Sequence, residues 1–328
     1  MQCASSKPRC WASIKLMLRL IFLGTPEFAV PTLERIVEAG HQVLTVVTQP
    51  DRPAGRGQRL APSPVKELAG RLGLAIFQPE RMRRPEAVEH LRALNAEAMV
   101  VVGYGQIIPQ SVIDLVPLGI INVHASLLPK YRGAAPIQWA IVNGETRTGV
   151  TTMRIDAGLD TGDMLLKAET EIGSEENAIE LGRRLAPMGA GLLIETLDGL
   201  ARGTIVPQGQ DPAGATLAPI LKKEDGLIDW RQPAQAVHNR VWGLQPWPGA
   251  YTRFRGQTLH IWQSQVKGEA CAPPARLEGV KSPSVCCGSG SLELVEVQLE
   301  GRKRMTAADF ANGQRLTGIE MLGDSTWI

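Results

Sequence analysis

Short apolar runs alternate with amphipathic segments over the first 200 residues. The apolar runs predict buried strands at 18–23, 43–48, 99–102 and 119–123, and two more strands at 149–155 and 164–169. The amphipathic spacing predicts helices at 28–39, 65–72, 85–94 and 177–200. Strands separated by helices in this way indicate a parallel sheet with right-handed crossovers. We therefore predict an α/β domain with a Rossmann-like, open, mostly parallel sheet.

The pattern changes after residue 203. The next stretch is rich in Gly, Pro and Ala and is predicted to be a linker. After one predicted helix at 234–242, short alternating runs follow at 251–254, 258–263 and 292–298. Such runs, separated by Gly and Pro turns, are typical of a small β-barrel. The predicted organisation is an extension at 1–16, an α/β domain at 17–203, a linker at 204–223 and a β domain at 224–328.

The composition is that of a soluble globular protein. Of the 328 residues, 44% are hydrophobic and 21% are charged. This length favours two domains over one. The formal net charge of +2 gives no overall basic field. It therefore neither supports nor excludes a nucleic-acid partner, because local patches can bind one.

The first 16 residues are basic and contain no acid, a composition that is also found in targeting peptides. The apolar run that follows them ends at Gly24 and is too short for a transmembrane helix. We therefore expect residues 1–16 to be a dispensable extension before a natural start near Met17. The protein is expected to be cytoplasmic.

The five cysteines stand at positions 3, 10, 271, 286 and 287. None lies between residues 11 and 270, and no CxxC pair is matched by a second ligand pair. Neither a structural zinc site nor a disulfide framework is expected from this distribution, and reduced thiols are predicted.

The α/β pattern raises the question of a nucleotide site. The turn after the first predicted strand, residues 24–28, lacks the G-x-G-x-x-G arrangement, and the chain has no G-x-x-x-x-G-K-[ST] loop. A dinucleotide or nucleoside triphosphate site is therefore not predicted. The carboxyl ends of the parallel strands remain the expected place for a ligand.

Two polar residues stand near one such strand end. Asn122 and His124 are two apart, so on a strand they point to the same face. An amide beside an imidazole suits acyl transfer, because the amide can stabilise an oxyanion while the imidazole handles charge. A hydrogen-bonded structural histidine is the more common alternative at such a position.

Two further segments follow predicted strands. Residues 130–139 place small residues at the start of a helix, where another molecule can approach closely or where the chain simply turns. Residues 156–163 contain three aspartates and two glycines, without the residue order of a calcium loop. This second segment is either a solvated turn or a loop that positions a carboxylate to relay a proton.

Together, N-x-H-x-S-L-L-P from Asn122, G-x-x-P-x-x-x-A from Gly133 and D-x-G-x-D-x-G from Asp156 resemble the folate-dependent formyltransferase superfamily, from about Met17 onward. The resemblance implies a catalytic trio of Asn122, His124 and Asp160. It also implies that 10-formyltetrahydrofolate donates the formyl group and that no metal is needed. Residues predicted to border the folate are Ser126, Leu127, Leu128 and Pro129.

The resemblance also suggests roles for the trio. The incoming amine attacks the formyl group directly, so negative charge builds on the formyl oxygen. Asn122 and His124 would hydrogen-bond that oxygen, while Asp160 would orient His124 and accept the amine proton.

A long loop at 49–64 follows the second predicted strand. It contains Arg52, Arg56 and Arg59 and four prolines, and it is expected to have no secondary structure. Long loops of this kind are usually functional, although a solvated connection is the plainer interpretation. The loop resembles the tRNA-contacting loop of those family members that formylate methionyl-initiator tRNA for translation initiation. Arg56, between two glycines, is the predicted discriminating contact.

The second predicted domain resembles, at residues 223–230 and 246–249, the OB-like tRNA-binding domain of the same family members. From Gln208 onward there are 13 Lys and Arg against 12 Asp and Glu, a net charge of +1, so any basic face must be local. No obligatory protein partner is evident. Two alternatives stay open: another formyltransferase or formyl-folate hydrolase, and a non-catalytic RNA-binding protein.

Overall fold

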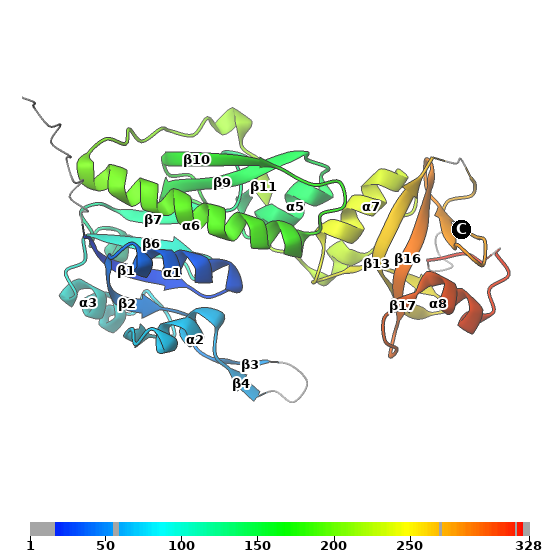
Figure 1. The fold of residues 1–328 in the computed structure, drawn as a ribbon, viewed down its shortest axis with the longest axis horizontal. Coiled ribbons are helices and arrows are strands. Elements are labelled where there is room, and N and C mark those ends of the chain that lie inside the picture. The colour runs from blue at the N-terminus through cyan, green and yellow to red at the C-terminus, as the bar shows by residue number, and fades with distance from the viewer. Residues whose placement is uncertain (1–16, 55–58, 269–270, 319, 324–328) are drawn as a thin grey trace, which may run out of the picture.

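The computed structural model describes residues 17–54, 59–268, 271–318 and 320–323. The predicted extension at 1–16 and Arg56 therefore lie outside the described residues. The chain forms an α/β domain and a β domain, which lie side by side along the long axis of the molecule (Figure 1). No helix within these ranges is long and apolar enough to cross a bilayer.

A seven-stranded sheet forms the centre of the α/β domain, in the order β10-β9-β7-β6-β1-β2-β5. The parallel part contains β1 (Arg19–Gly24), β2 (Gln42–Val47), β5 (Ile76–Phe77), β6 (Ala98–Val102) and β7 (Ile120–His124). At one edge, β9 (Arg147–Arg154) and β10 (Met164–Glu171) are antiparallel. The predicted open and mostly parallel sheet is confirmed.

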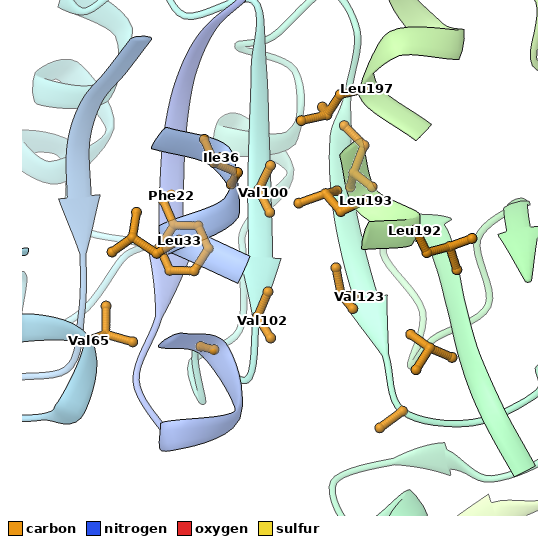
Figure 2. Packing of buried hydrophobic residues seen from close by; sticks show 14 of the residues in the cluster. Phe22, Leu33, Ile36, Val65, Val100, Val102, Val123, Leu192, Leu193 and Leu197 are labelled. Atoms are coloured by element: carbon orange, nitrogen blue, oxygen red, sulfur yellow. The ribbon is translucent and has the colours of Figure 1, made fainter. Parts of the chain in front are cut away.

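The apolar strands are buried on both faces because helices cover both sides. Leu20 and Phe22 of β1 pack with α1 (Val30–Glu38), α2 (Pro64–Arg71) and α6 (Ala178–Arg202), and Figure 2 shows this cluster from close by. Ile21 and Leu23 alternate with them and face α3 (Pro85–Ala93) and α4 (Gln110–Ile113). Burial on both faces explains why these strands read as continuous apolar runs.

The long helix α6 begins and ends with strong local signals. Asn177 and Glu180 form a capping box at its N-terminus, and Gly203 adopts the left-handed conformation, with φ of 68°, at its C-terminus. The predicted helix at 177–200 was therefore nearly correct. Of the helix predicted at 28–39, the first residues instead form a 3-10 turn at Glu27–Ala29.

The arginine-containing loop at 49–64 was expected to have no secondary structure, and this expectation was wrong. β3 (Arg52–Ala54) and β4 (Arg59–Ala61) pair as an antiparallel hairpin that projects from the α/β domain (Figure 1). The interpretation as an irregular loop overlooked that each side of the turn has room for a short strand.

The β domain contains a six-stranded antiparallel sheet. Its order is β12-β13-β16-β15-β14, with β17 also paired to β16. The strands are β12 (Ala250–Phe254), β13 (Gln257–Lys267), β14 (Leu277–Glu278), β15 (Ser284–Cys286), β16 (Ser291–Leu299) and β17 (Met305–Thr306). Two helices, α7 (Ala234–Gly243) and α8 (Ala307–Gln314), share its core. An OB-like barrel is compatible with this sheet and stays a prediction.

The segment between the domains is partly paired to the α/β domain. β11 (Leu217–Ala218) lies parallel to β8 (Arg132–Gly133). Gly133 has φ of 124°, and a side chain there would lie 2.5 Å from the Ala218 carbonyl oxygen. Farther along, α7 packs on α5 (Pro136–Val142), so that a helix from each domain forms the junction. The exact domain boundaries stay predictions.

The expectation of reduced thiols was wrong for one pair. Cys271 and Cys286 form a disulfide, with Cα atoms 5.4 Å apart. Their pairing depends on how β14 and β15 meet, which the spacing along the chain does not reveal. Cys287 is free and buried, while Cys3 and Cys10 lie outside the described residues.

Candidate functional site

Asn122 and His124 lie at the carboxyl end of β7, where the sheet changes from parallel to antiparallel pairing. Both side chains are almost fully buried. The Asn122 amide has no hydrogen-bond partner among the described residues, so its donor is available to a ligand. This geometry is consistent with the prediction that Asn122 and His124 point to the same face near the end of a strand.

His124 is held between a carbonyl and a carboxylate. Its Nε2 lies 2.8 Å from the Tyr131 carbonyl oxygen. Because a carbonyl oxygen only accepts, Nε2 carries a proton. Nδ1 faces Asp160, whose Oδ2 is 3.7 Å away. This separation is too long for a hydrogen bond, but the two groups attract each other when the imidazole is protonated.

Asp160 reaches His124 because its own backbone is unusual. It adopts the left-handed conformation, with φ of 50°, and its Oδ2 accepts a hydrogen bond of 2.8 Å from the Gly133 backbone N–H. The side chain is only 19% exposed. The structure thus brings Asp160 next to His124, although the two residues are 36 positions apart in the sequence. Asn122 stands two residues before His124 on the same strand.

Another aspartate of this loop, Asp156, stabilises the loop from within. Asp156 accepts hydrogen bonds from the Thr161 hydroxyl, at 2.8 and 2.9 Å, and from the Gly158 N–H at 3.0 Å. A side chain at Gly162 would lie 2.0 Å from the Arg154 carbonyl oxygen, so only glycine fits there. In the described ranges, these carboxylates form no group that could hold a metal ion. The loop is built to fix Asp160.

Gln210 supports the loop from outside and was not found by sequence reasoning. Its Nε2 donates to the carbonyl oxygens of Asp160 and Gly162, both at 2.8 Å. Its Oε1 accepts from Arg132 at 3.0 and 2.8 Å. Gln210 lies in the predicted linker, and no local pattern marks it, because its role arises only from the way this segment crosses the site.

The four residues predicted to border the folate differ in exposure. Ser126 and Leu128 are buried. The Ser126 hydroxyl donates to the Lys130 carbonyl at 2.6 Å, and the Leu128 N–H donates to the Thr151 hydroxyl at 3.1 Å. Leu127 and Pro129 are partly exposed and can contact a ligand. The hydrogen bonds of Ser126 and Leu128 therefore fix the turn that holds Leu127 and Pro129. Contact of these four residues with the folate stays a prediction.

A cavity of about 300 Å³ lies at the same edge of the sheet. Residues after β2, β5 and β6 line it, among them Gln49, Arg52, Arg81, Arg83, Gln106 and Ile107. Asn122, His124 and Asp160 do not line it, although β6 is the direct neighbour of β7. The cavity is therefore adjacent to the polar strand end, and three arginines are among the residues that line it.

The base of the arginine-containing hairpin is anchored beside this cavity. Asp51 accepts hydrogen bonds from Lys66 Nζ at 2.6 Å and from Gln78 Nε2 at 2.9 Å. The hydrogen bond from Lys66 lowers the pKa of the Asp51 carboxyl. Arg52 is exposed and donates to Gln49 at 3.2 Å. The backbone of Arg59 lies in β4, but its side chain, like all of Arg56, is outside the described part.

Comparison with known proteins matches both domains. The formyl transferase family model matches residues 18–197, and the model of the formyl transferase C-terminal domain matches residues 220–315. The chain is 71% identical to the methionyl-tRNA formyltransferase of Solibacter usitatus, over 94% of this chain and 99% of that protein. It is 56% identical to the methionyl-tRNA formyltransferase of Koribacter versatilis, over 93% and 98%.

Solved structures share the fold at lower identity. The N-formyltransferase from Helicobacter canadensis, in complex with folinic acid and dTDP-3-aminofucose, is 18% identical with a TM-score of 0.64, over 85% of this chain and 99% of that chain. HypX from Aquifex aeolicus, in complex with tetrahydrofolic acid, is 16% identical with a TM-score of 0.63, over 95% and 50%. At these identities the likeness concerns the fold alone.

Proposed function

Because this chain belongs to the formyl transferase family, and within it to the methionyl-tRNA formyltransferases, we propose that it transfers the formyl group of 10-formyltetrahydrofolate to the free amino group of methionyl-initiator tRNA. The product is N-formylmethionyl-tRNA for translation initiation. The observation that carries the proposal is the meeting of Asn122, His124 and Asp160 at one strand end. We also propose a cytoplasmic location, where initiator tRNA is used, and action without an obligatory protein partner.

The three side chains match the charges that develop during direct attack of an amine on a formyl group. The Asn122 amide donates to the formyl oxygen as negative charge builds there. Nε2 of His124 is engaged by the Tyr131 carbonyl, so Nδ1 is the ring atom left to address that oxygen. When Nδ1 is protonated it donates, and the nearby Asp160 carboxylate stabilises the positive ring.

The proton of the attacking amine needs an acceptor. Asp160 is the carboxylate at this strand end, and its second oxygen is not engaged by Gly133. A carboxylate in this position can accept the proton as the new carbon–nitrogen bond forms. It then returns that proton to the folate nitrogen, which leaves with the electrons of the bond that breaks. No thiol takes part, in agreement with the lack of cysteine from residue 11 to residue 270.

The cavity beside the trio fits the far end of the folate donor. A folate ends in a glutamate with two carboxylates, and Arg81 and Arg83 are among the residues that line the cavity. Its volume of about 300 Å³ is at the small end of ligand pockets, which suits one end of a longer molecule. The formyl end would then lie toward Leu127, Pro129 and the trio.

The acceptor stem of tRNA is proposed to contact the hairpin. Arg52 belongs to β3 and Arg59 to β4, Arg56 stands between them in the sequence, and the hairpin projects from the same edge of the sheet that carries the cavity. Guanidinium groups pair with phosphates and stack on exposed bases, which suits an acceptor end. The Asp51 contacts hold the base of the hairpin.

The direct test supplies the purified full chain with 10-formyltetrahydrofolate and methionine-charged initiator tRNA, and measures N-formylmethionine after the ester is hydrolysed. An elongator methionyl-tRNA, an amino-sugar nucleotide and a reaction without acceptor serve as controls. We expect efficient formylation of the initiator tRNA only. Preferential formylation of the sugar nucleotide, or release of formate without an acceptor, would instead support the other formyltransferase or the hydrolase.

A further inference from the structure

A second cluster of reactive side chains lies in the β domain, far along the chain from the catalytic trio. Sγ of Cys271, Sγ of Cys286 and a carboxylate oxygen of Glu278 lie within 4.8 Å of one another. It is the one such group of possible metal ligands among the residues that the structure describes. Neither the formyl transfer chemistry nor the proposed tRNA contacts use these residues.

The sheet register explains why the three groups meet. In the antiparallel pair of β14 and β15, Glu278 lies opposite Ser284, and the Cys286 N–H donates to the Arg276 carbonyl at 2.9 Å. Cys286 is two residues from Ser284, so its side chain and that of Glu278 share one face of the pair. The loop that leads into β14 brings Cys271 over this face. Cys286 itself is fully buried.

We propose that Cys271, Cys286 and Glu278 form a redox-controlled site for a thiophilic divalent cation of the zinc class. In the oxidised chain the disulfide occupies both sulfurs and no cation binds. Reduction by a dithiol breaks the S–S bond: the dithiol gives two electrons and two protons and becomes a disulfide itself. The cation then replaces both thiol protons and is held by two thiolates and one carboxylate.

Both states fit the same backbone. A Cα separation of 5.4 Å lies within the range of disulfides. Two thiolates bound tetrahedrally to zinc at about 2.3 Å have their sulfurs about 3.7 Å apart. Side-chain rotation can supply that change, because all three ligand atoms already lie within 4.8 Å.

The surroundings also suit the charge of such a site. Two thiolates and one carboxylate carry three negative charges against two on the cation. Arg276 forms an ion pair with Glu278 and supplies the remaining positive charge. Soft sulfur ligands together with one carboxylate select zinc and cadmium over magnesium or calcium.

Neighbouring Cys287 provides a matched control within the same strand end. Its thiol is buried, donates to the Val285 carbonyl at 3.7 Å, and is not part of the cluster. Replacing Cys287 should therefore leave metal binding unchanged.

The test uses Cd²⁺ as the probe, because cadmium thiolates absorb in the ultraviolet. The full chain carries Cys3→Ser and Cys10→Ser, so that these thiols add no signal. We expect one Cd²⁺ per reduced chain and none per oxidised chain. Cys271→Ser and Cys286→Ser should abolish the absorption, Cys287→Ser should keep it, and Glu278→Gln should keep the band but weaken binding about tenfold or more.

A second measurement uses the unsubstituted chain, so its result does not depend on whether a cysteine variant folds. The unchanged chain is alkylated with and without Cd²⁺, and the modified peptides are identified by mass spectrometry. Cd²⁺ should protect the partly exposed Cys271 in the reduced chain, and Cys271 should resist alkylation without metal in the oxidised chain. Absorption that survives in Cys271→Ser or Cys286→Ser, a reduced chain that binds no Cd²⁺, or an oxidised chain that binds it equally well would overturn the proposal.

Discussion

The two loops that flank the strand-end site are held in opposite ways. The loop at residues 156–163 is fixed from within by Asp156 and from outside by Gln210. The arginine-containing hairpin is anchored only at its base in the described residues, through Asp51, Lys66 and Gln78. Chemistry needs a carboxylate placed to a fraction of an ångström, whereas contact with a large nucleic acid needs charge presented outward. The difference predicts separate effects on turnover and on tRNA selection.

The largest effects should come from the proposed catalytic trio itself. Asn122→Ala should lower turnover about a hundredfold to a thousandfold, because one donor to the developing oxyanion is lost. Combined with His124→Ala or Asp160→Ala, the loss should be far from additive, since the groups act as a unit. Steady-state formylation of initiator tRNA measures this, with His90→Ala, at an exposed position of α3, as a control. Losses that simply multiply would show that the groups act independently.

Gly162→Ala tests the rigidity of the catalytic loop. The added methyl group would meet the Arg154 carbonyl oxygen at 2.0 Å, so the loop must shift and stability should fall by about 1–3 kcal/mol. Urea unfolding measures the change, and turnover should fall with it. Gly191→Ala in α6 is the matched control, because nothing lies within 4 Å of the new methyl group. Equal stability of both variants would contradict the packing argument.

Gln210→Ala removes the support that reaches the loop from the interdomain segment. Two hydrogen bonds to the Asp160 and Gly162 carbonyls disappear, so we expect kcat to fall about tenfold with little change in KM for either substrate. Exposed Gln208 serves as the control two residues away. A higher KM with unchanged kcat would instead assign Gln210 to substrate binding.

Arg56→Ala should affect selection of tRNA more than chemistry. We predict a steeper loss of activity on initiator tRNA than for Lys222→Ala or Arg302→Ala, which should mainly reduce the salt dependence of binding, by about one charge each. Turnover on initiator and elongator methionyl-tRNA at two salt concentrations provides the measurement. Small and equal losses for the three variants would leave recognition to the β domain.

Asp51→Asn should give the smallest effect. The folded carboxyl has a lowered pKa because Lys66 donates a hydrogen bond to it. The contact is therefore fully present above the usual carboxyl pKa and is lost as the pH falls through the lower folded value. At neutral pH we expect KM for tRNA to rise a few-fold at an unchanged kcat, with exposed Asp114→Asn as the control. A variant that lowers kcat instead would link the hairpin to the chemistry.

Much of the α/β domain could be predicted because its rules are local. The period of two along β7 places Asn122 and His124 on one face, and uninterrupted apolar runs indicate strands that are covered on both sides. Asp160 came from the family motif and not from spacing. Gln210 and the pairing of β8 with β11 could not be predicted, because they depend on how distant segments cross. The Cys271–Cys286 pair was missed for the same reason.

The most direct test of the central claim is the single-turnover rate of formyl transfer by His124→Ala, with both substrates bound to saturation. If the strand-end trio performs the chemistry, the wild-type chain forms N-formylmethionyl-tRNA, and the variant does so about a hundredfold or more slowly. Substrate affinity and the unfolding midpoint should stay near the wild-type values. A folded variant that transfers the formyl group at a rate close to wild type would contradict the account.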